Sequence, residues 1–196
     1  MQPCLILAGY NKEKTKMKKL ISLFALLAFC AVGAGAIAIQ KEDPSVSFDG
    51  KTFYLRYSEG SSQMWLNEYL PQGSTLGNYT YMFAVRSYDG NPSLTPQQMG
   101  SAVITNLLRS YPNTNYSFFP SGKDTGLKFL ITDGKNWEFN LFRFTVKNGM
   151  PISLQFVYRE PVSAEAKMEK NLQRQEEWGR KLMSLPVPSV VRSVKK

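Results

Sequence analysis

The sequence predicts an α+β fold: a single twisted antiparallel sheet of six to seven strands with one helix packed on it and a C-terminal amphipathic helix. Several short runs alternate apolar and polar residues, the period of a half-buried strand. Asp-Gly and Asn-Gly pairs stand between some of these runs, as they do in hairpins. Two other stretches, one central and one C-terminal, have apolar residues at the helical spacing.

The first half of the sheet is expected between residues 46 and 88. A short strand over 46–48 would end at the Asp49-Gly50 turn. Three longer strands follow, at 52–58, 63–70 and 79–88. They are separated by turn-forming residues rich in glycine, serine and proline.

A helix is predicted over 96–110. Thr95 is a suitable N-cap, Pro96 occupies the first helical position, and Gln98 completes a capping box. Apolar residues then recur at four-residue spacing, and the helix should end before Pro112.

The period of two returns after this helix. The expected strands cover 116–119, 127–132, 137–146 and 152–158. Asp133-Gly134 and Asn148-Gly149 join the last three of them, which indicates an antiparallel meander.

The last regular element is a charged helix within 162–185, which Ser163 can cap. Its apolar stripe is narrow and includes Met168, Trp178 and Leu182. We therefore expect it to dock through this seam alone, on the domain or on a partner, with a loose basic tail after it over 186–196.

The N-terminus resembles a secretory leader that starts at Met17. Two lysines precede an apolar run too short for a comfortable membrane span, and a small-residue site predicts cleavage after Ala36 or, as the second choice, after Ala38. Phe29 before Cys30 argues against a lipoprotein signal. The predicted organisation is a leader at 1–38, an α+β domain at 39–161, the C-terminal helix at 162–185 and the tail.

Composition narrows the chemistry further. The chain has no histidine, and both of its cysteines, Cys4 and Cys30, lie in the leader. Histidine-based catalysis, thiol catalysis and thiolate metal sites are therefore excluded for the mature chain, and we expect no catalytic residues, no metal and no cofactor. Five of the 24 basic and one of the 15 acidic residues lie in the leader, so the net charge falls from +9 to +5 on cleavage. The remaining charge is scattered, which is not typical of a specific nucleic-acid binder.

One carboxylate breaks the alternation. Glu68 falls on the same side as Leu66 and Leu70, which indicates either a slipped register or bulge, or a buried carboxylate paired with Arg56 or Arg86.

Aromatic residues are the remaining clue, because they occur on both faces of the first strands. They indicate either a sheet covered on both faces or an aromatic surface for a ligand or partner. The candidate surface residues are Tyr54, Trp65, Tyr69, Tyr79, Tyr81, Tyr88 and Trp178.

The segment WLNEYLPQGSTLGNYTYMFAVRSY, residues 65–88, resembles a segment of small secreted bacterial proteins of unknown function. With the helix and meander that follow, residues 50–160 are similar to PsbP-like α+β domains. This resemblance implies an accessory or binding role without catalytic residues.

The sequence thus favours a non-enzymatic bacterial envelope protein, periplasmic or secreted, that binds an envelope partner. The alternatives are a carrier or sensor of a small apolar ligand, using a pocket between sheet and first helix, and a carboxylate hydrolase. The partner is expected to be an envelope protein or an apolar small molecule, and contact with the membrane is expected only through the leader during export.

Overall fold

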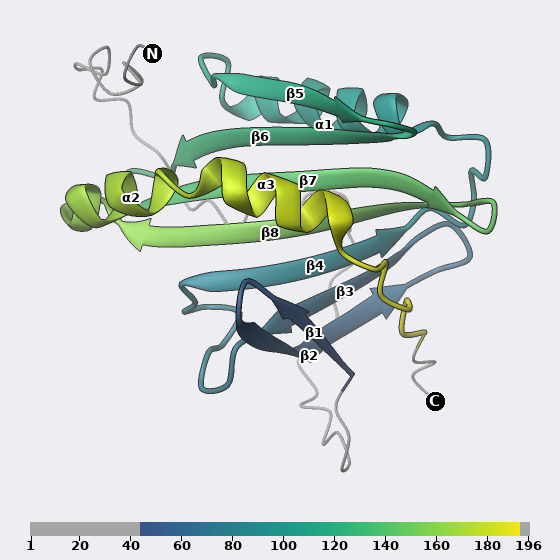
Figure 1. Cartoon of the computed structure of the whole chain (residues 1–196), viewed down its shortest axis with the longest axis horizontal. Coiled ribbons are helices and arrows are strands. Elements are labelled where there is room, and N and C mark those ends of the chain that lie inside the picture. Colours follow the sequence, from purple (N-terminus) through teal and green to yellow (C-terminus); the bar gives the residue numbers. More distant parts are fainter. Residues whose placement is uncertain (1–43, 193–196) are drawn as a thin grey trace. The chain divides into compact units, whose positions relative to one another are not determined.

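The computed structural model describes residues 44–192, which form one antiparallel sheet of eight strands in the order β1-β2-β3-β4-β8-β7-β6-β5 (Figure 1). The strands are β1 (Ser45–Phe48), β2 (Lys51–Gly60), β3 (Trp65–Leu70), β4 (Tyr81–Ser87), β5 (Tyr116–Ser121), β6 (Asp124–Thr132), β7 (Asn136–Lys147) and β8 (Met150–Pro161). The helices are α1 (Pro96–Ser110), α2 (Glu165–Leu172) and α3 (Gln175–Ser184), with a short 3₁₀ turn, η2 (Val162–Ala164), before α2. None of these helices is long and apolar enough to span a membrane.

The expected count of six to seven strands and one packed helix beside a C-terminal helix was therefore wrong. The short run at 46–48 is a genuine strand because Asp49 and Gly50 both adopt positive φ, 50° and 71°. This two-residue turn matches the twist of the strands that it joins and pairs Phe48 with Lys51. The C-terminal helix is two helices, because the chain tightens after α2 into a bond from the Arg174 N–H to the Asn171 carbonyl.

Local turn and capping signals in the sequence are confirmed. Asn148 and Gly149 have φ of 53° and 75° and join β7 to β8. At α1, the Thr95 hydroxyl accepts from the Gln98 N–H at 3.2 Å, and the Gln98 side chain accepts from the Thr95 N–H at 2.9 Å. The predicted limits of this helix, 96–110, are those observed.

Helices cover both faces of the sheet. Helix α1 packs on β6 and β7 from one face, here called the α1 face. Helices α2 and α3 pack on β8, β7 and β6 from the other, here called the α3 face, and Figure 1 shows α3 in front of the sheet with α1 behind it. The α1 helix buries Met99, Ile104 and Leu107.

The C-terminal helices dock on the domain through the predicted stripe, whose residues belong to the main core. Trp178 is fully buried, and its ring lies 5.1 Å from that of Phe156 and 5.9 Å from that of Phe139. Met168 and Leu182 are buried in the same cluster. The stripe is narrow, but burial of the large side chains of Met168, Trp178 and Leu182 stabilises the packing of these helices. Residues 162–185 thus share one core with the strands.

The segment after α3 lies along the sheet instead of hanging free. The side-chain amide of Asn67, which is fully buried, donates to the Val191 carbonyl at 2.9 Å and accepts from the Val191 N–H at 2.7 Å. Arg192 forms an ion pair with Asp89 at 2.8 Å. The tail is therefore fixed as far as residue 192, and its last residues lie outside the described part of the chain.

Candidate functional site

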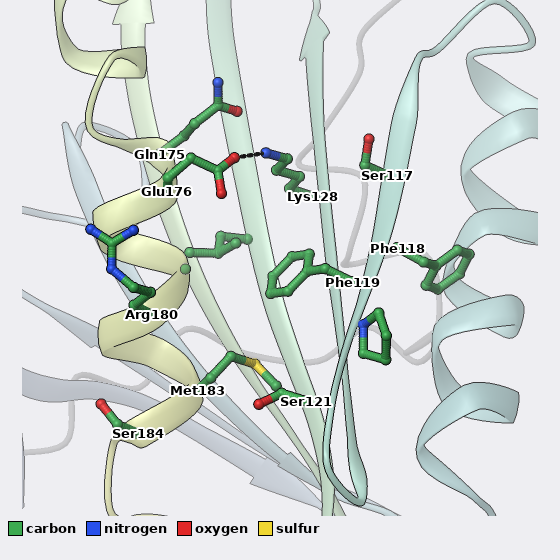
Figure 2. A pocket seen from close by; sticks show the side chains of 13 residues that line it. Ser117, Phe118, Phe119, Ser121, Lys128, Gln175, Glu176, Arg180, Met183 and Ser184 are labelled. Atoms are coloured by element: carbon green, nitrogen blue, oxygen red, sulfur yellow. Dashed lines mark hydrogen bonds and ion pairs between the residues drawn. The ribbon is translucent and has the colours of Figure 1, made fainter.

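A groove of about 580 Å³ lies on the α3 face, between helix α3 and the edge strand β5 (Figure 2). Phe119 and Leu141 contribute apolar surface from the sheet, and Met183 does so from the helix. The residues that line it are Ser117, Phe118, Phe119, Pro120, Ser121, Lys128, Leu141, Gln175, Glu176, Gly179, Arg180, Met183 and Ser184.

The β5–β6 hairpin determines which backbone groups of β5 face outward. Its two-residue turn starts with Gly122 at a φ of 61° and pairs Ser121 with Asp124. Hydrogen-bonded and non-hydrogen-bonded pairs alternate along an antiparallel ladder from this closing pair. Tyr116, Phe118 and Pro120 thus direct their backbone groups away from β6, at the outer edge of the sheet. A proline fits such a position because it has no N–H to leave unpaired.

Small residues shape the groove around one aromatic ring. Phe119 lies over Gly126 of β6, where an added Cβ would come within 2.1 Å of the ring. At Gly179 of α3 an added Cβ would stand 4.0 Å from the same ring. Ser117 and Ser121, which share this face of β5 by alternation, are small and leave the groove open on its strand side.

The charges of the groove lie on its rim. Lys128 forms an ion pair with Glu176 across one end, as Figure 2 shows. Arg180 is exposed and forms no hydrogen bond or ion pair within residues 44–192, and its guanidinium lies on the solvent side of α3. Lys123 is exposed at the tip of the β5–β6 hairpin. The groove therefore combines an apolar floor with an excess of positive charge at its rim.

The opposite side of β5 presents exposed aromatic rings. Tyr116 is 43% exposed and Phe118 is 40% exposed, and their rings pack edge to face at 5.9 Å. Phe118 also lies against α1, where a Cβ added at Gly100 would come within 2.7 Å of its ring. The edge strand thus offers apolar contacts on both faces beside its outward backbone groups.

The aromatic residues singled out from the sequence do not form one surface. Trp65, Tyr69, Tyr81 and Trp178 lie on the α3 face, whereas Tyr54, Tyr79 and Tyr88 lie on the α1 face. Tyr69, Tyr79 and Trp178 are buried, and Tyr81 stacks on Tyr158 at 5.2 Å. The groove residues were missed, although the alternation Ser117-Phe118-Phe119 already divides this segment between two faces.

Glu68 lies on the α1 face with Leu66 and Leu70, as its alternation predicted. A bulge between Leu55 and Tyr57 of β2 stands opposite it, so the register is also irregular here. Burial raises the pKa of the Glu68 carboxyl, and the positive charge of Arg86 counteracts only part of that rise. Arg56 lies over the ring of Tyr54, with its guanidinium carbon 5.6 Å from the centroid.

A buried hydrogen-bonded row crosses β4, β8 and β7 on the α1 face. Arg86 donates to Gln155 at 2.8 Å, Gln155 to Asn140 at 2.7 Å, and Asn140 to the carboxylate of Glu138 at 3.1 Å. The Tyr79 hydroxyl donates to the same carboxylate at 3.3 Å. The side-chain amides of Gln155 and Asn140 each accept one hydrogen bond and donate another. This row therefore aligns the central strands.

Glu68 on β3 and Glu138 on β7 belong to strands that are three strand spacings apart, about 14 Å between their backbones. The two acids of a glycosidase stand about 5–9.5 Å apart. Among residues 44–192 no group of acidic, histidine or cysteine side chains could hold a metal ion.

The fold is thus an antiparallel sheet with helices on both faces and an open groove near one edge. A family model matches residues 41–187, three quarters of the chain, so the protein belongs to that family, a family of uncharacterised proteins. The match indicates no enzymatic family. Comparison with curated proteins and with solved structures gave no match.

Proposed function

We propose that this protein is an exported, non-enzymatic module of the bacterial envelope, periplasmic or secreted, that binds a partner through β5 and the groove beside α3. The observation that carries the proposal is the edge strand itself. Its outward backbone groups, exposed aromatic rings and neighbouring groove occur together at one side of the sheet. An exposed edge of this kind is a template for another chain unless it is covered.

Export is supported by the leader, which lies outside the described residues. Lys18 and Lys19 precede the apolar run, and Ala34-Gly35-Ala36 supplies the cleavage site. Removal of the leader takes both cysteines with it.

A role without catalysis is supported by the chemistry of the described residues. Two carboxylates of the core are engaged in hydrogen bonds: Glu138 with Asn140 and Tyr79, and Glu160 with Tyr158 at 2.9 Å. We also propose that residues 50–160 form a PsbP-like domain, which would imply the same accessory role.

The alternative, a carrier of a small apolar ligand, is favoured by the volume of the groove. About 580 Å³ exceeds the roughly 300 Å³ at which ligand pockets begin. The groove is open to solvent, however, and lies on the face opposite the expected pocket beside the first helix. These features fit a macromolecular partner better.

The test is photo-crosslinking in a bacterium that expresses the chain with its own leader. A photoreactive residue replaces Ser117 in the groove or, as the control, the exposed Ala102 on α1. We expect a processed protein that starts at Ile37 or Ile39 in the envelope fraction, and a discrete adduct at position 117 only. Retention of an unprocessed protein in the cytoplasm, or identical adducts at both positions, would contradict the proposal.

A further inference from the structure

We infer that residues 39–43, which follow the proposed cleavage sites, pair with the outer edge of β2 over residues 56–60 and so lengthen β1 in the mature protein. These five residues lie outside the described part of the chain, and the edge that they would cover lies inside it. Because it concerns the mature N-terminus, this inference rests on the proposed function.

Strand β2 is longer than the strand beside it. β1 pairs with residues 51–54 of β2, and one further bond runs from the Leu55 N–H to the Pro44 carbonyl at 2.9 Å. Residues 56–60 pair with β3 on one side, and on the other side they make no backbone hydrogen bond within residues 44–192. Glu59 and Gly60 are exposed. The second half of β2 thus presents an open edge.

The chain already runs along this edge where the described residues begin. A strand continued from Pro44 toward the N-terminus, antiparallel to β2, runs toward Gly60, where β2 ends. Cleavage after Ala38 leaves five residues before Pro44, and five residues of β2 are unpaired on this side. The segment is therefore long enough to cover the open edge.

Backbone alternation sets the register. The Ser61 N–H donates across the β2–β3 turn at 2.9 Å, and counting back from this bonded residue, Ser58 and Gly60 direct their backbone groups away from β3. The bulge in β2 adds one residue between the last position bonded to β1 and Ser58. Glu42 therefore comes opposite Ser58, and Gln40 comes opposite Gly60.

Charge supports the same register. Asp43 comes beside Arg56, and Lys41 comes beside Glu59, so that both pairs join opposite charges. Glu59 accepts a hydrogen bond from Tyr57 and has no ion pair within residues 44–192, so Lys41 would supply its cation. The family match begins at residue 41, which places both residues of the segment that carry these charges inside the family's domain.

A strand of this composition would also protect the edge. Three of its five residues are charged, and charged side chains on an edge strand oppose pairing with another chain. β5, with its exposed aromatic rings, then stays the edge that is available to the partner.

The experiment follows amide hydrogen exchange by NMR in the ¹⁵N-labelled chain from Ile37 to Lys196. We expect exchange at Ser58 and Gly60 to be about tenfold slower than in the double variant Gln40→Pro/Glu42→Pro, which removes the two N–H donors that face β2. The matched control is Ile39→Pro/Lys41→Pro, whose prolines stand where the N–H faces away from β2. It should keep most of the protection.

A charge exchange tests the register itself. Lys41→Glu should raise the exchange rate at Ser58 and Gly60 about twofold, and adding Glu59→Lys should restore the slower rate. Equally fast exchange at both amides in the native chain and in Gln40→Pro/Glu42→Pro would overturn the inference. Protection that rises with protein concentration would also overturn it, because it would show that a second copy covers this edge. Crosslinking at position 117 decides the proposed function separately.

Discussion

The indole N–H of Trp178 donates a hydrogen bond to the carboxylate of Asp49 at 2.9 Å, although 129 positions separate the two residues in the sequence. The same carboxylate accepts bonds from Arg174 at 2.8 and 2.9 Å and from Lys181 at 2.6 Å. Asp49 lies in the β1–β2 turn, so one buried carboxylate joins the first hairpin of the described chain to its last helix.

Asp49→Asn should lower the free energy of unfolding by about 1.5–3 kcal/mol, the usual value of hydrogen bonds to a charged group. The substitution keeps the size of the side chain but removes its charge, and it leaves the Trp178 indole with a poorer acceptor. Urea denaturation followed by tryptophan fluorescence measures the change. Glu169→Gln, an exposed position on α2, is the control and should have almost no effect.

The contribution of Asp49 should disappear in acid. Burial alone would raise its pKa, but the hydrogen bonds from Lys181 and Trp178 and the charge of Arg174 outweigh burial and lower it below 3.8. A carboxylate with a lowered folded-state pKa stabilises the fold above its unfolded pKa and loses that contribution as the pH falls through the folded value. The stability difference between the native protein and Asp49→Asn should thus be full at neutral pH and shrink below about pH 4. A difference that grows on acidification would contradict this assignment.

Glu68→Gln should have the opposite pH signature. Burial raises the pKa of Glu68 above 4.5, so its neutral form favours the fold and stability is lost as the pH rises through the folded value. The amide cannot ionise, so the variant should be at least as stable as the native protein near neutral pH and should lack this loss. Thermal unfolding at several pH values provides the measurement. Marked destabilisation at pH 7 would show that the attraction to Arg86 outweighs burial.

A chain that ends at Leu185 should lose about 1–3 kcal/mol of stability, because the buried Asn67 amide loses both of its bonds to Val191. A chain that ends at Arg192 keeps these bonds and serves as the control. Differential scanning calorimetry compares the two. Equal melting temperatures would mean that water satisfies the Asn67 amide as well as the tail does, with no loss of stability.

Two glycines facing the same ring should respond differently to alanine. Gly126→Ala places a Cβ 2.1 Å from the Phe119 ring and should cost about 1–3 kcal/mol. Gly179→Ala makes only an ordinary contact at 4.0 Å and should be neutral or stabilising by up to about 1 kcal/mol in its helix. Combining Gly126→Ala with Phe119→Ala should be less destabilising than the sum of the two, which a double-mutant cycle measures. An additive cycle would show that the ring is not what resists the methyl group.

Local signals in the sequence predicted the local structure well. The capping box of Thr95 and Gln98 determined where α1 begins, and the Asn148-Gly149 turn determined the β7–β8 hairpin. Both depend on residues a few positions apart, which a linear pattern contains.

Long-range features could not be predicted in this way. That β5 is an edge strand depends on the pairing of β4 with β8, and no local pattern encodes that order. The depth of the C-terminal helices depends on Trp178, whose buried ring and bonded indole need partners from β7, β8 and the β1–β2 turn. The candidate groove was missed for the same reason, since β5 and α3 meet only in the folded chain.

The position of β8 has a consequence for the order of events during biogenesis. Residues 150–161 form a central strand between β4 and β7, so the two halves of the sheet have no common partner until nearly the whole chain has been synthesised. Sheets that depend on such distant pairings fold slowly. We therefore expect a newly made chain to stay unfolded long enough for the proposed leader to be recognised, and an unfolded polypeptide is the form that can be threaded across a membrane.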